Sequence, residues 1–431
     1  MTSGWKAAVA AVAVLVAGPA FADDTKVGAG AEFGTSFLGS DGFVDLSPQL
    51  WLQSGAWQFG LGAPLRYRVL DGDPKDGCKT PGLRCPDWDE MGDYGRILRF
   101  FDYGGWSGDV NVHLGDLTGV SLGHGELVYR YYNNWQYDSW HTGALVDVQK
   151  PDFGLSLLTN DVLRWDLLAV RAWGRPVSSG YWRKLRFGLQ AAWDREVTGH
   201  DGKESSTHRD DGPWRPEAPA LAMDLSLVAW GDDRRALTTY LSVSGHATDA
   251  LAVHMGASWH RRGDLATVLT LESRVVAPFG SPYLPGWFGT LYELQTRSLR
   301  GPTARNAAAT NKATAGVRAS VEWARAYKFR FAGVVDWLHD RRLDATAWLG
   351  TDPNKKLQLN AMVAKVFFDR GPGDPLQWTG NLAAKLWVQG PWYAQCAVGR
   401  KWRVREVVPE GTSPLYSELE VRLAVGADLS W

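Results

Sequence analysis

The densest group of side chains that could do acid–base chemistry lies in the stretch GHGELVYRYYNNWQYDSWH, from Gly123 to His141. An imidazole can take the proton of a hydroxyl nucleophile, so His141 with Ser139 or Thr142 could form a hydrolytic pair. Adjacent strand residues point to opposite faces, which separates His141 from Thr142, and no acid that would orient the imidazole is evident. We therefore expect no enzymatic activity. The remaining interpretation is a polar constriction or a periplasmic rim, built from His124, Glu126, Arg130, Asp138 and His141.

Patterns for metals and cofactors are weak. The segment DGDPKDG places Asp71, Asp73 and Asp76 together, but it departs from the EF-hand spacing and lacks the distal glutamate, so a solvated turn is the better interpretation than a Ca²⁺ site. Cys78 and Cys85 lie in one polar stretch, where no further cysteine or histidine completes a zinc set, and they predict a loop disulfide. No nucleotide or phosphate fingerprint is present, and we expect no metal and no cofactor.

Composition and the first residues bound the compartment and the partners. The chain has 46 basic and 47 acidic residues, which gives no electrostatic case for nucleic acid as a partner. Lys6 is followed by an apolar run to about Val16 and then by Ala20-Phe21-Ala22, which predicts a cleaved signal peptide over residues 1–22. No later stretch has the roughly 18 apolar residues that a membrane helix needs. The sequence therefore predicts an exported protein that is not a helical membrane protein.

The segments that would position these side chains alternate with a period of two, as strands with two unlike faces do. The last thirteen residues, EVRLAVGADLSW preceded by Leu419, have apolar side chains at every odd position. The same alternation occurs in residues 184–194, 221–229, 251–259, 315–323, 328–337 and 382–388.

Tryptophans and loops add a second regularity. The chain contains 23 tryptophans, and several apolar rows end in one, as an aromatic girdle at a membrane surface requires. Short turns are expected at residues 231–233, 247–249 and 261–264, and long polar loops at 71–92, 198–219, 280–286, 301–312 and 405–414. Short turns and long loops in alternation are typical of a barrel whose two rims face different compartments.

With these features the chain resembles a Gram-negative outer-membrane β-barrel. In that family the last strand ends in an aromatic residue preceded by alternating apolar residues, and the barrel-assembly machinery recognises this pattern. The residues that match it are Leu423, Val425, Ala427, Leu429 and Trp431. The resemblance implies one all-β domain over residues 23–431, a transmembrane antiparallel up-and-down β-barrel of about 16 to 20 strands, with 18 as the best guess.

Residues 105–176 alternate less clearly and are more polar, so they predict either short or bulged strands or a part folded into the lumen. The charges expected on the lumen side are of both signs, which predicts weak ion selectivity; they could equally serve only to wet the lumen or to pair across it. These residues are Asp194, Asp224, His254, Glu272, Arg274, Arg318, Glu322, Lys328, Arg330, Asp336, Lys385, Glu418, Glu420 and Arg422.

The resulting hypothesis is a porin-like channel in the cell outer membrane for passive diffusion of small polar solutes. Its expected partners are outer-membrane lipid, the barrel-assembly machinery and the solutes, and a homo-oligomer is possible. Two alternatives stay open at this point. One is a barrel enzyme acting on envelope lipids, and the other is a structural or receptor barrel whose lumen is plugged.

Overall fold

The computed structural model describes sixteen stretches of the chain. They are residues 25–72, 81–88, 91–104, 109–134, 140–177, 179–194, 219–232, 234–246, 250–278, 288–289, 313–325, 329–338, 342–351, 356–366, 377–404 and 415–430. The predicted signal peptide lies outside them. Among the described residues, no helix has the length and apolar character to cross a membrane.

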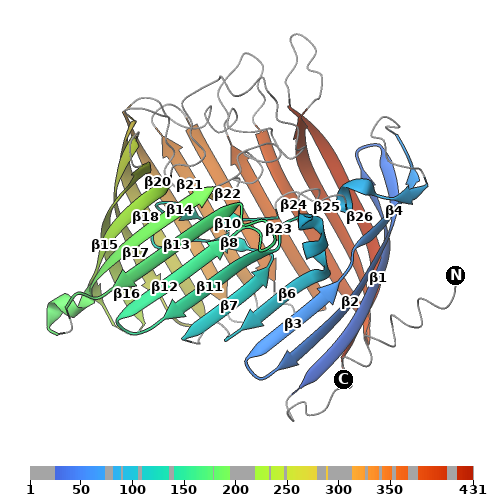
Figure 1. Cartoon of the computed structure of the whole chain (residues 1–431), viewed down its shortest axis with the longest axis horizontal. Coiled ribbons are helices and arrows are strands. Elements are labelled where there is room, and N and C mark those ends of the chain that lie inside the picture. The colour runs from blue at the N-terminus through green and yellow to red at the C-terminus, as the bar shows by residue number, and fades with distance from the viewer. Residues whose placement is uncertain are drawn as a thin grey trace, which may run out of the picture.

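The described strands form a closed antiparallel barrel of 20 strands (Figure 1). β3 and β4 count as one barrel strand, because they pair with successive parts of β2. The first half comprises β1 (Lys26–Leu38), β2 (Asp41–Ser54), β3 (Trp57–Gly62), β4 (Leu65–Leu70), β6 (Leu98–Tyr103), β7 (Val110–Gly115), β11 (Gly143–Gln149), β12 (Phe153–Thr159), β13 (Leu167–Gly174), β14 (Leu185–Asp194) and β15 (Ala220–Gly231). The second half comprises β16 (Arg235–His246), β17 (Ala250–Arg261), β18 (Leu265–Pro278), β20 (Thr314–Arg325), β21 (Phe329–Leu338), β22 (Arg342–Thr351), β23 (Leu357–Val366), β24 (Gln377–Gln389), β25 (Trp392–Val404) and β26 (Leu415–Ser430).

The predicted fold class is confirmed, and the best guess of 18 strands is two short of the number found. Closure comes from β26, which pairs with β1 over eleven positions, from Gly28 opposite Ser430 to Leu38 opposite Glu420. Pairing of the first strand with the last removes the two open edges that a sheet would otherwise expose to lipid.

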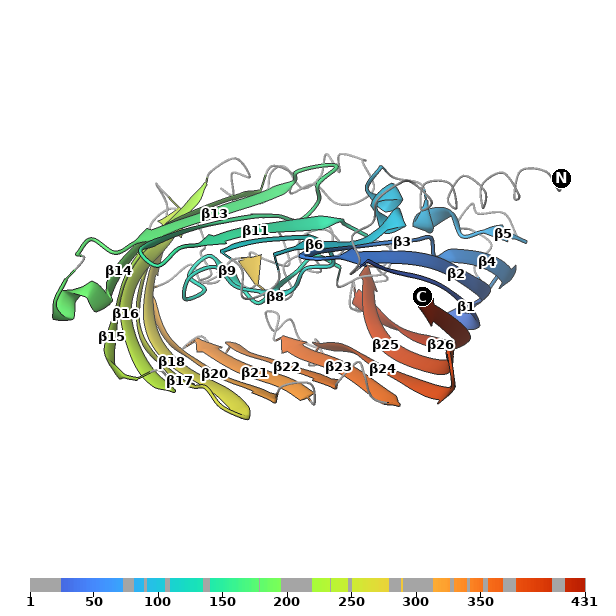
Figure 2. The ribbon, with the colours of Figure 1, turned by 90° about the horizontal axis from the view of Figure 1, so that it is seen from below.

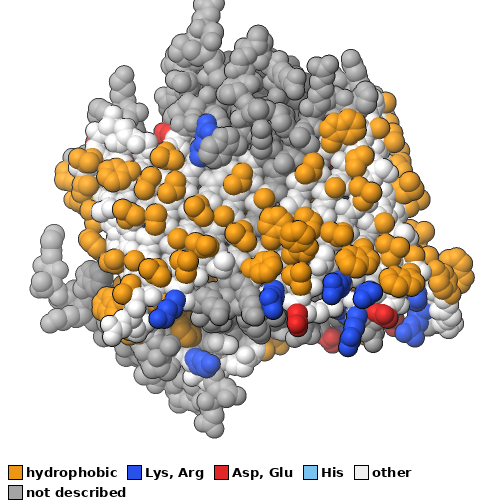
Figure 3. All heavy atoms as spheres, turned by 180° about the vertical axis from the view of Figure 1, so that it is seen from behind, with side chains coloured by type: hydrophobic (Ala, Val, Ile, Leu, Met, Phe, Trp, Pro, Cys, Tyr) orange, Lys and Arg blue, Asp and Glu red, His pale blue; other side chains and the backbone are white. Residues whose placement is uncertain are grey.

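The two faces of the wall differ as the alternation predicts. On β18, Leu269, Leu271 and Val275 are exposed outward, whereas Glu272 and Arg274 between them are 1% and 2% exposed. On the face seen in Figure 3, apolar side chains form a broad band over the outer surface, and most of the charged side chains in view lie below it. A wall with an apolar outside and a polar inside is the construction of a membrane barrel.

Connections are sorted between the two rims. The short turns at Gly55, Asp232, Arg262 and Gly390 lie at the rim where β1 begins and β26 ends, which we call the short-turn rim (Figure 1). A longer connection between β13 and β14, residues 175–184, lies at this rim too. Of the five long loops predicted from sequence, 71–92 is described in part and connects β4 to β6 at the opposite rim. The predicted loops 280–286, 301–312 and 405–414, and all but the last residue of 198–219, lie outside the described residues. A short turn, residues 39–40, joins β1 to β2 at the opposite rim as well. The predicted short turn at residues 247–249 lies outside the described residues.

Residues 105–176 combine both predicted possibilities. Short strands β7, β11, β12 and β13 continue the wall, and the described residues of 116–142 between β7 and β11, namely 116–134 and 140–142, turn into the barrel. This inward segment carries β8 (Thr118–Val120), β9 (Val128–Tyr129) and β10 (Tyr131–Tyr132), of which β8 pairs with β10 and β9 pairs with β19 (Phe288–Gly289). Seen from the short-turn rim, β8 and β9 lie inside the ring of wall strands (Figure 2).

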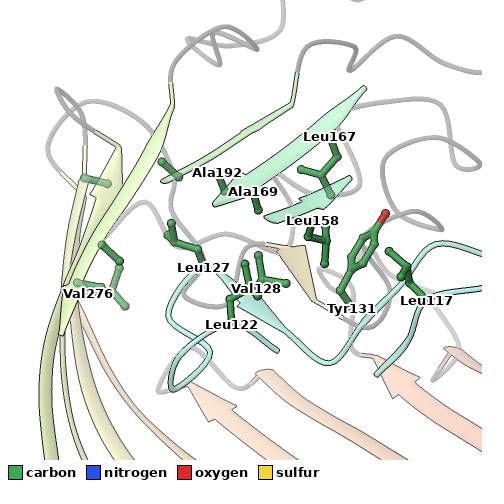
Figure 4. Packing of buried hydrophobic residues seen from close by; sticks show 14 residues of the cluster. Leu117, Leu122, Leu127, Val128, Tyr131, Leu158, Leu167, Ala169, Ala192 and Val276 are labelled. Carbon is green, nitrogen blue, oxygen red and sulfur yellow. The ribbon is translucent and has the colours of Figure 1, made fainter. Parts of the chain in front are cut away.

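The inward segment is held by an apolar cluster. Its Leu117, Leu122, Leu127, Val128 and Tyr131 pack with small and apolar side chains on the inner face of the wall (Figure 4). The wall contributes Leu158, Leu167, Ala169, Ala192, Ala220, Ala222, Ala250, Ala252 and Val276. Alanines at inward positions leave room for the segment, so its place in the lumen is determined by packing.

Short elements complete the rims. The remaining strand is β5 (Gly82–Leu83), and the 3₁₀ helices are η1 (Cys85–Asp87), η2 (Gly92–Ile97) and η3 (Tyr181–Lys184). Cys85 is disulfide-bonded and Cys396 is a free, exposed thiol. Cys78, the partner predicted for Cys85, lies outside the described residues, as do Asp73 and Asp76 of the acidic loop; Asp71 pairs with Arg68 at 3.3 Å.

Candidate functional site

The tip of the inward segment is a tight turn made possible by two glycines. Gly123 and Gly125 have φ angles of +62° and +85°, in the left-handed region that side chains other than glycine rarely adopt. A Cβ on Gly123 would lie 2.5 Å from Nε2 of Gln190 on the wall, and one on Gly125 would lie 2.3 Å from the Tyr129 ring. The glycines let the backbone of His124 approach the inner wall closely.

Glu126 and His124 bind the turn to β14 and β15. Oε2 of Glu126 accepts hydrogen bonds from Gln190 Nε2 at 2.6 Å and from the backbone N–H of His124 at 3.2 Å. The His124 Nε2 atom lies 3.7 Å from Asp224 Oδ1, and Asp224 also accepts a bidentate contact from Arg171 Nη2 at 2.9 and 3.1 Å. Burial lowers the pKa of His124, and the Glu126 and Asp224 carboxylates oppose this effect without outweighing it. The lowered pKa keeps the imidazole neutral near pH 7.

Arg318 of β20 joins the turn to the wall. Its Nη2 donates to Glu272 Oε2 at 2.7 Å and to the carbonyl oxygen of His124 at 2.7 Å, and its Nη1 donates to the carbonyl oxygen of Gly125 at 3.1 Å. The guanidinium carbon lies 3.8 Å from the centroid of the Tyr129 ring. A fully buried guanidinium with this many partners is a rigid point of attachment.

Glu272 is the acceptor at the centre of the network. Besides Arg318, it accepts a hydrogen bond from the Tyr240 hydroxyl at 2.8 Å, and its Oε1 lies 3.2 Å from Nδ1 of His254. His254 Nε2 in turn lies 2.8 Å from the Ser244 hydroxyl. Strands β16, β17, β18 and β20 therefore all converge on one buried carboxylate.

Two further ion pairs extend this network. Arg274 pairs with Asp336 of β21, and Arg130 of the inward segment contacts Glu322 Oε1 at 3.1 Å. Part of the predicted lumen set and part of the predicted constriction thus meet in one cluster, in which acidic and basic side chains are paired. We call this cluster the anchoring network. It consists of His124, Glu126, Tyr129, Arg130, Arg171, Gln190, Asp224, Tyr240, Ser244, His254, Glu272, Arg274, Arg318, Glu322 and Asp336.

The opposite wall carries a separate paired group. Arg422 Nη2 lies 2.5 Å from Glu32 Oε1, and Arg422 Nε lies 3.4 Å from Asp45 Oδ2. Arg66 lies between Asp45 at 3.9 Å and Glu420 at 3.0 Å. These side chains come from β26, β1, β2 and β4, so they also tie the closing strands of the barrel together across the inner face.

The other predicted lumen residues are distributed around the wall. Asp194 is buried, Glu418 is partly buried and Arg330 is exposed. Lys385 contacts Asp428 at 3.1 Å near the short-turn rim. Lys328 and Asp138 lie outside the described residues.

Among the residues predicted as an assembly signal, Leu423, Val425 and Leu429 are exposed on the outer face and Ala427 is half-buried. Trp431 lies outside the described residues.

His141 has an acidic partner that the sequence did not identify. Its Nδ1 lies 3.2 Å from Asp161 Oδ2, between β12 and β13. His141 is 3% exposed and lies at the base of the inward segment, and its backbone carbonyl accepts from Asn133 and Asn134 at 2.8 Å each. A buried pair inside the barrel cannot reach lipid at the outer wall, and Ser139 lies outside the described residues.

Sequence reasoning missed several members of the anchoring network: Tyr129, Arg171, Gln190, Tyr240 and Ser244. Gln190 could have been found, because it shares the inward parity of Asp194 on the same strand. Tyr240 has the same parity as Ser242 and Ser244, but the pattern of residues 235–246 is mostly small and polar and does not mark a face clearly.

No protein-family model matches this sequence, and the search of curated proteins found no match. Solved structures with a similar arrangement include Pseudomonas aeruginosa OpdK with vanillate, at 10% identity and a TM-score of 0.36, covering 96% of this chain and 100% of that chain. Pseudomonas aeruginosa OpdL has 12% identity and a TM-score of 0.35, and the match covers 95% of this chain and 100% of that chain. Acinetobacter baumannii OccAB4 has 9% identity and a TM-score of 0.35, and the match covers 96% of this chain and 100% of that chain. The assignment of this chain as a membrane β-barrel rests on its own strand register and outer apolar band.

Proposed function

We propose that this protein is a passive channel of the Gram-negative outer membrane, through which small polar solutes diffuse. The observation that carries the proposal is the combination of a closed barrel with residues 116–142 anchored inside it by ion pairs and hydrogen bonds. A barrel of this strand number is wide enough for an aqueous lumen, and an inward segment narrows such a lumen without closing the wall.

The charges of the lumen support a channel with weak ion preference. In the anchoring network and in the group around Arg422, carboxylates and guanidinium groups lie side by side and largely neutralise one another. Strong charge selection comes from rings of one sign, and paired charges give a polar lining instead. The solutes expected to pass are therefore small and polar, of either charge or of none.

Export and assembly belong to the same proposal. Residues 1–22 would direct the chain across the inner membrane, and the last strand, with Leu423, Val425, Ala427, Leu429 and Trp431, would be recognised by the barrel-assembly machinery. Outer-membrane lipid would contact the apolar band. Association of several copies into a homo-oligomer stays a prediction.

Single-channel recording of the refolded mature protein in a planar lipid bilayer tests the proposal. We expect steady openings whose reversal potential in a salt gradient lies close to zero. A second protein, in which residues 118–132 are replaced by a short Gly-Ser linker, should conduct more current because the constriction is removed. A correctly folded unaltered barrel that stays silent would refute the channel; if the linker variant then conducts, the inward segment plugs the lumen and a receptor barrel is favoured.

A further inference from the structure

A cleft of about 670 Å³ lies on the inner wall near the short-turn rim, away from the anchoring network. It is lined by Gln49 and Trp51 of β2, Lys385 and Trp387 of β24, and Asp428 of β26, with the Gly390–Pro391 turn and Leu429 beside them. Volumes of this size and linings of aromatic rings with a few convergent polar groups are typical of small-molecule sites.

The polar groups of the cleft are held in place before any ligand binds. Asp428 accepts from Gln49 Nε2 at 2.5 Å through Oδ1 and from Lys385 Nζ at 3.1 Å through Oδ2. Gly30 makes this arrangement possible, because a Cβ there would lie 2.4 Å from Asp428 Oδ1 and 2.7 Å from Gln49 Nε2. The three side chains therefore form a fixed row of donors and acceptors.

The aromatic rings are fixed in the same way. The Trp51 indole covers Gly28, where a Cβ would lie 2.1 Å from the ring, and Tyr393 covers Gly426, where a Cβ would lie 2.4 Å away. Lys385 Nζ lies 3.5 Å from the Tyr393 ring centroid and 4.5 Å from that of Trp387. Trp51 and Tyr393 thus pack against the wall where a glycine leaves space, and the Trp387 ring lies edge-on to the Tyr393 ring with centroids 5.0 Å apart. The platform is therefore part of the fold.

Charge decides which solute fits. Lys385 and Asp428 neutralise each other, so the cleft offers no net charge to a ligand, and an anion would have to compete with Asp428 for the ammonium group. Two indoles offer apolar surfaces, and the row of Gln49, Asp428 and Lys385 offers both donors and acceptors. A ring with an apolar C–H face and hydroxyl groups at its edge satisfies both.

We propose that this cleft binds a neutral sugar ring, and that it does so on the path of the solute at the short-turn mouth of the barrel. Binding of the sugar does not depend on the channel function; only its place on the solute path rests on that proposed function. The sugar would stack its C–H face on Trp51 or Trp387 and exchange hydrogen bonds with Gln49, Asp428 and Lys385.

Isothermal titration of the refolded protein in detergent tests binding separately from conduction. We expect glucose to bind more tightly than glucuronate, which has the same ring and one negative charge. Trp387→Ala should weaken glucose binding about threefold to tenfold, the range expected for loss of one aromatic contact. The matched control is Trp193→Ala, which removes an exposed indole from the outer face and should leave binding unchanged. Equal dissociation constants for glucose in Trp387→Ala and in the unaltered protein would overturn the site.

A second variant tests the charge argument without removing a ring. Asp428→Asn keeps the size of the side chain but leaves Lys385 without its carboxylate, so the cleft becomes positive. We expect this variant to bind glucuronate more tightly than glucose, a reversal of the order in the unaltered protein. An unaltered protein that binds neither sugar, or prefers glucuronate, would refute a neutral-sugar site.

Bilayer recordings then separate this inference from the proposed function. If the channel conducts and glucose added at the short-turn side reduces its current, both stand. If it conducts and glucose neither binds nor alters the current, the channel stands and the sugar site falls. If glucose binds but the barrel is silent, the cleft is a sugar site of a closed barrel and the channel proposal falls.

Discussion

The imidazole of His124 lies flat on the phenol ring of Tyr240, with the ring centroids 3.9 Å apart and the planes inclined by 3°. One residue belongs to the inward segment and the other to wall strand β16. The Tyr240 hydroxyl donates to Glu272, which also accepts from Arg318, and Arg318 donates to the backbone of His124. The constriction is therefore attached to the wall by a closed circuit of contacts.

Removal of Arg318 should loosen this attachment. The change Arg318→Ala removes the nearer guanidinium partner of the buried Glu272 carboxylate, leaving Arg274 at 4.0 Å, and frees two backbone carbonyls of the turn. We expect a loss of about 3 kcal/mol in the free energy of unfolding, the cost typical of breaking one side of a buried ion pair. Urea unfolding of the folded barrel in lipid vesicles measures it. Arg330→Ala, an exposed arginine on the adjacent strand, is the matched control, and equal losses in both variants would contradict the special role of Arg318.

Acid should weaken the anchoring through His124. Burial lowers its pKa below the ordinary value of 6.5, so the unfolded chain takes up a proton at a higher pH than the folded one. The contribution of neutral His124 is therefore fully present above its ordinary pKa and is lost progressively as the pH falls from about 6.5.

The measurement is the free energy of unfolding at several pH values between about 5 and 7.5, compared with that of His124→Phe. Phenylalanine keeps a ring on Tyr240 but does not titrate. Between these pH values the free energy of unfolding should rise less steeply with pH in the variant. The difference is the contribution of one proton that the unfolded chain takes up at His124 and the folded protein does not. An identical slope in both proteins would show that His124 does not titrate differently on folding. The neighbouring ionisable groups, Glu126, Arg171, Asp224, Glu272 and Arg318, are present in both proteins, so the difference in slope reports His124 together with its interaction with them.

A charged side chain introduced on the outer face should destabilise the folded barrel, whereas one introduced on the inner face should not. Leu271 is exposed near the middle of β18, and the change Leu271→Arg places a guanidinium in the apolar band. Such a substitution costs about 2 to 4 kcal/mol near the bilayer midplane. Thr270→Arg, one position away and pointing inward, is the control. Folding yield into lipid vesicles should fall for the first variant and stay close to normal for the second; equal yields would mean that the two faces have been assigned wrongly.

Closure of the barrel can be tested by crosslinking. Ala31 of β1 lies opposite Ala427 of β26, so Ala31→Cys with Ala427→Cys should form a disulfide in the folded barrel under mild oxidation. The free Cys396 is first changed to serine. Phe33→Cys with Ala427→Cys is displaced by two residues and should not crosslink. Efficient bonding of the displaced pair would require a different register between the first and last strands.

The sequence by itself determined the class of fold and the direction of the side chains. Alternation depends only on the strand period, so Leu271 and Glu272 are assigned to opposite faces from their positions along the chain. The order of short turns and long loops likewise gave the two rims, because loop length is a local property. The 20 strands found lie within the expected range of 16 to 20, and the best guess of 18 is two short because chain length gives only an average number of residues per strand.

Only the tertiary structure decided which charges meet. His124 and Arg318 are 194 positions apart, and the contact between them requires that residues 116–142 fold inward and that β20 lie within reach of the turn. Sequence placed both among the polar residues of the lumen but could not distinguish pairing from free exposure, because pairing depends on the barrel's circumference and on packing of the inward segment. The cleft between Trp51 and Trp387 was missed for the same reason: its walls come from β2, β24 and β26, which become neighbours only when the first strand closes on the last.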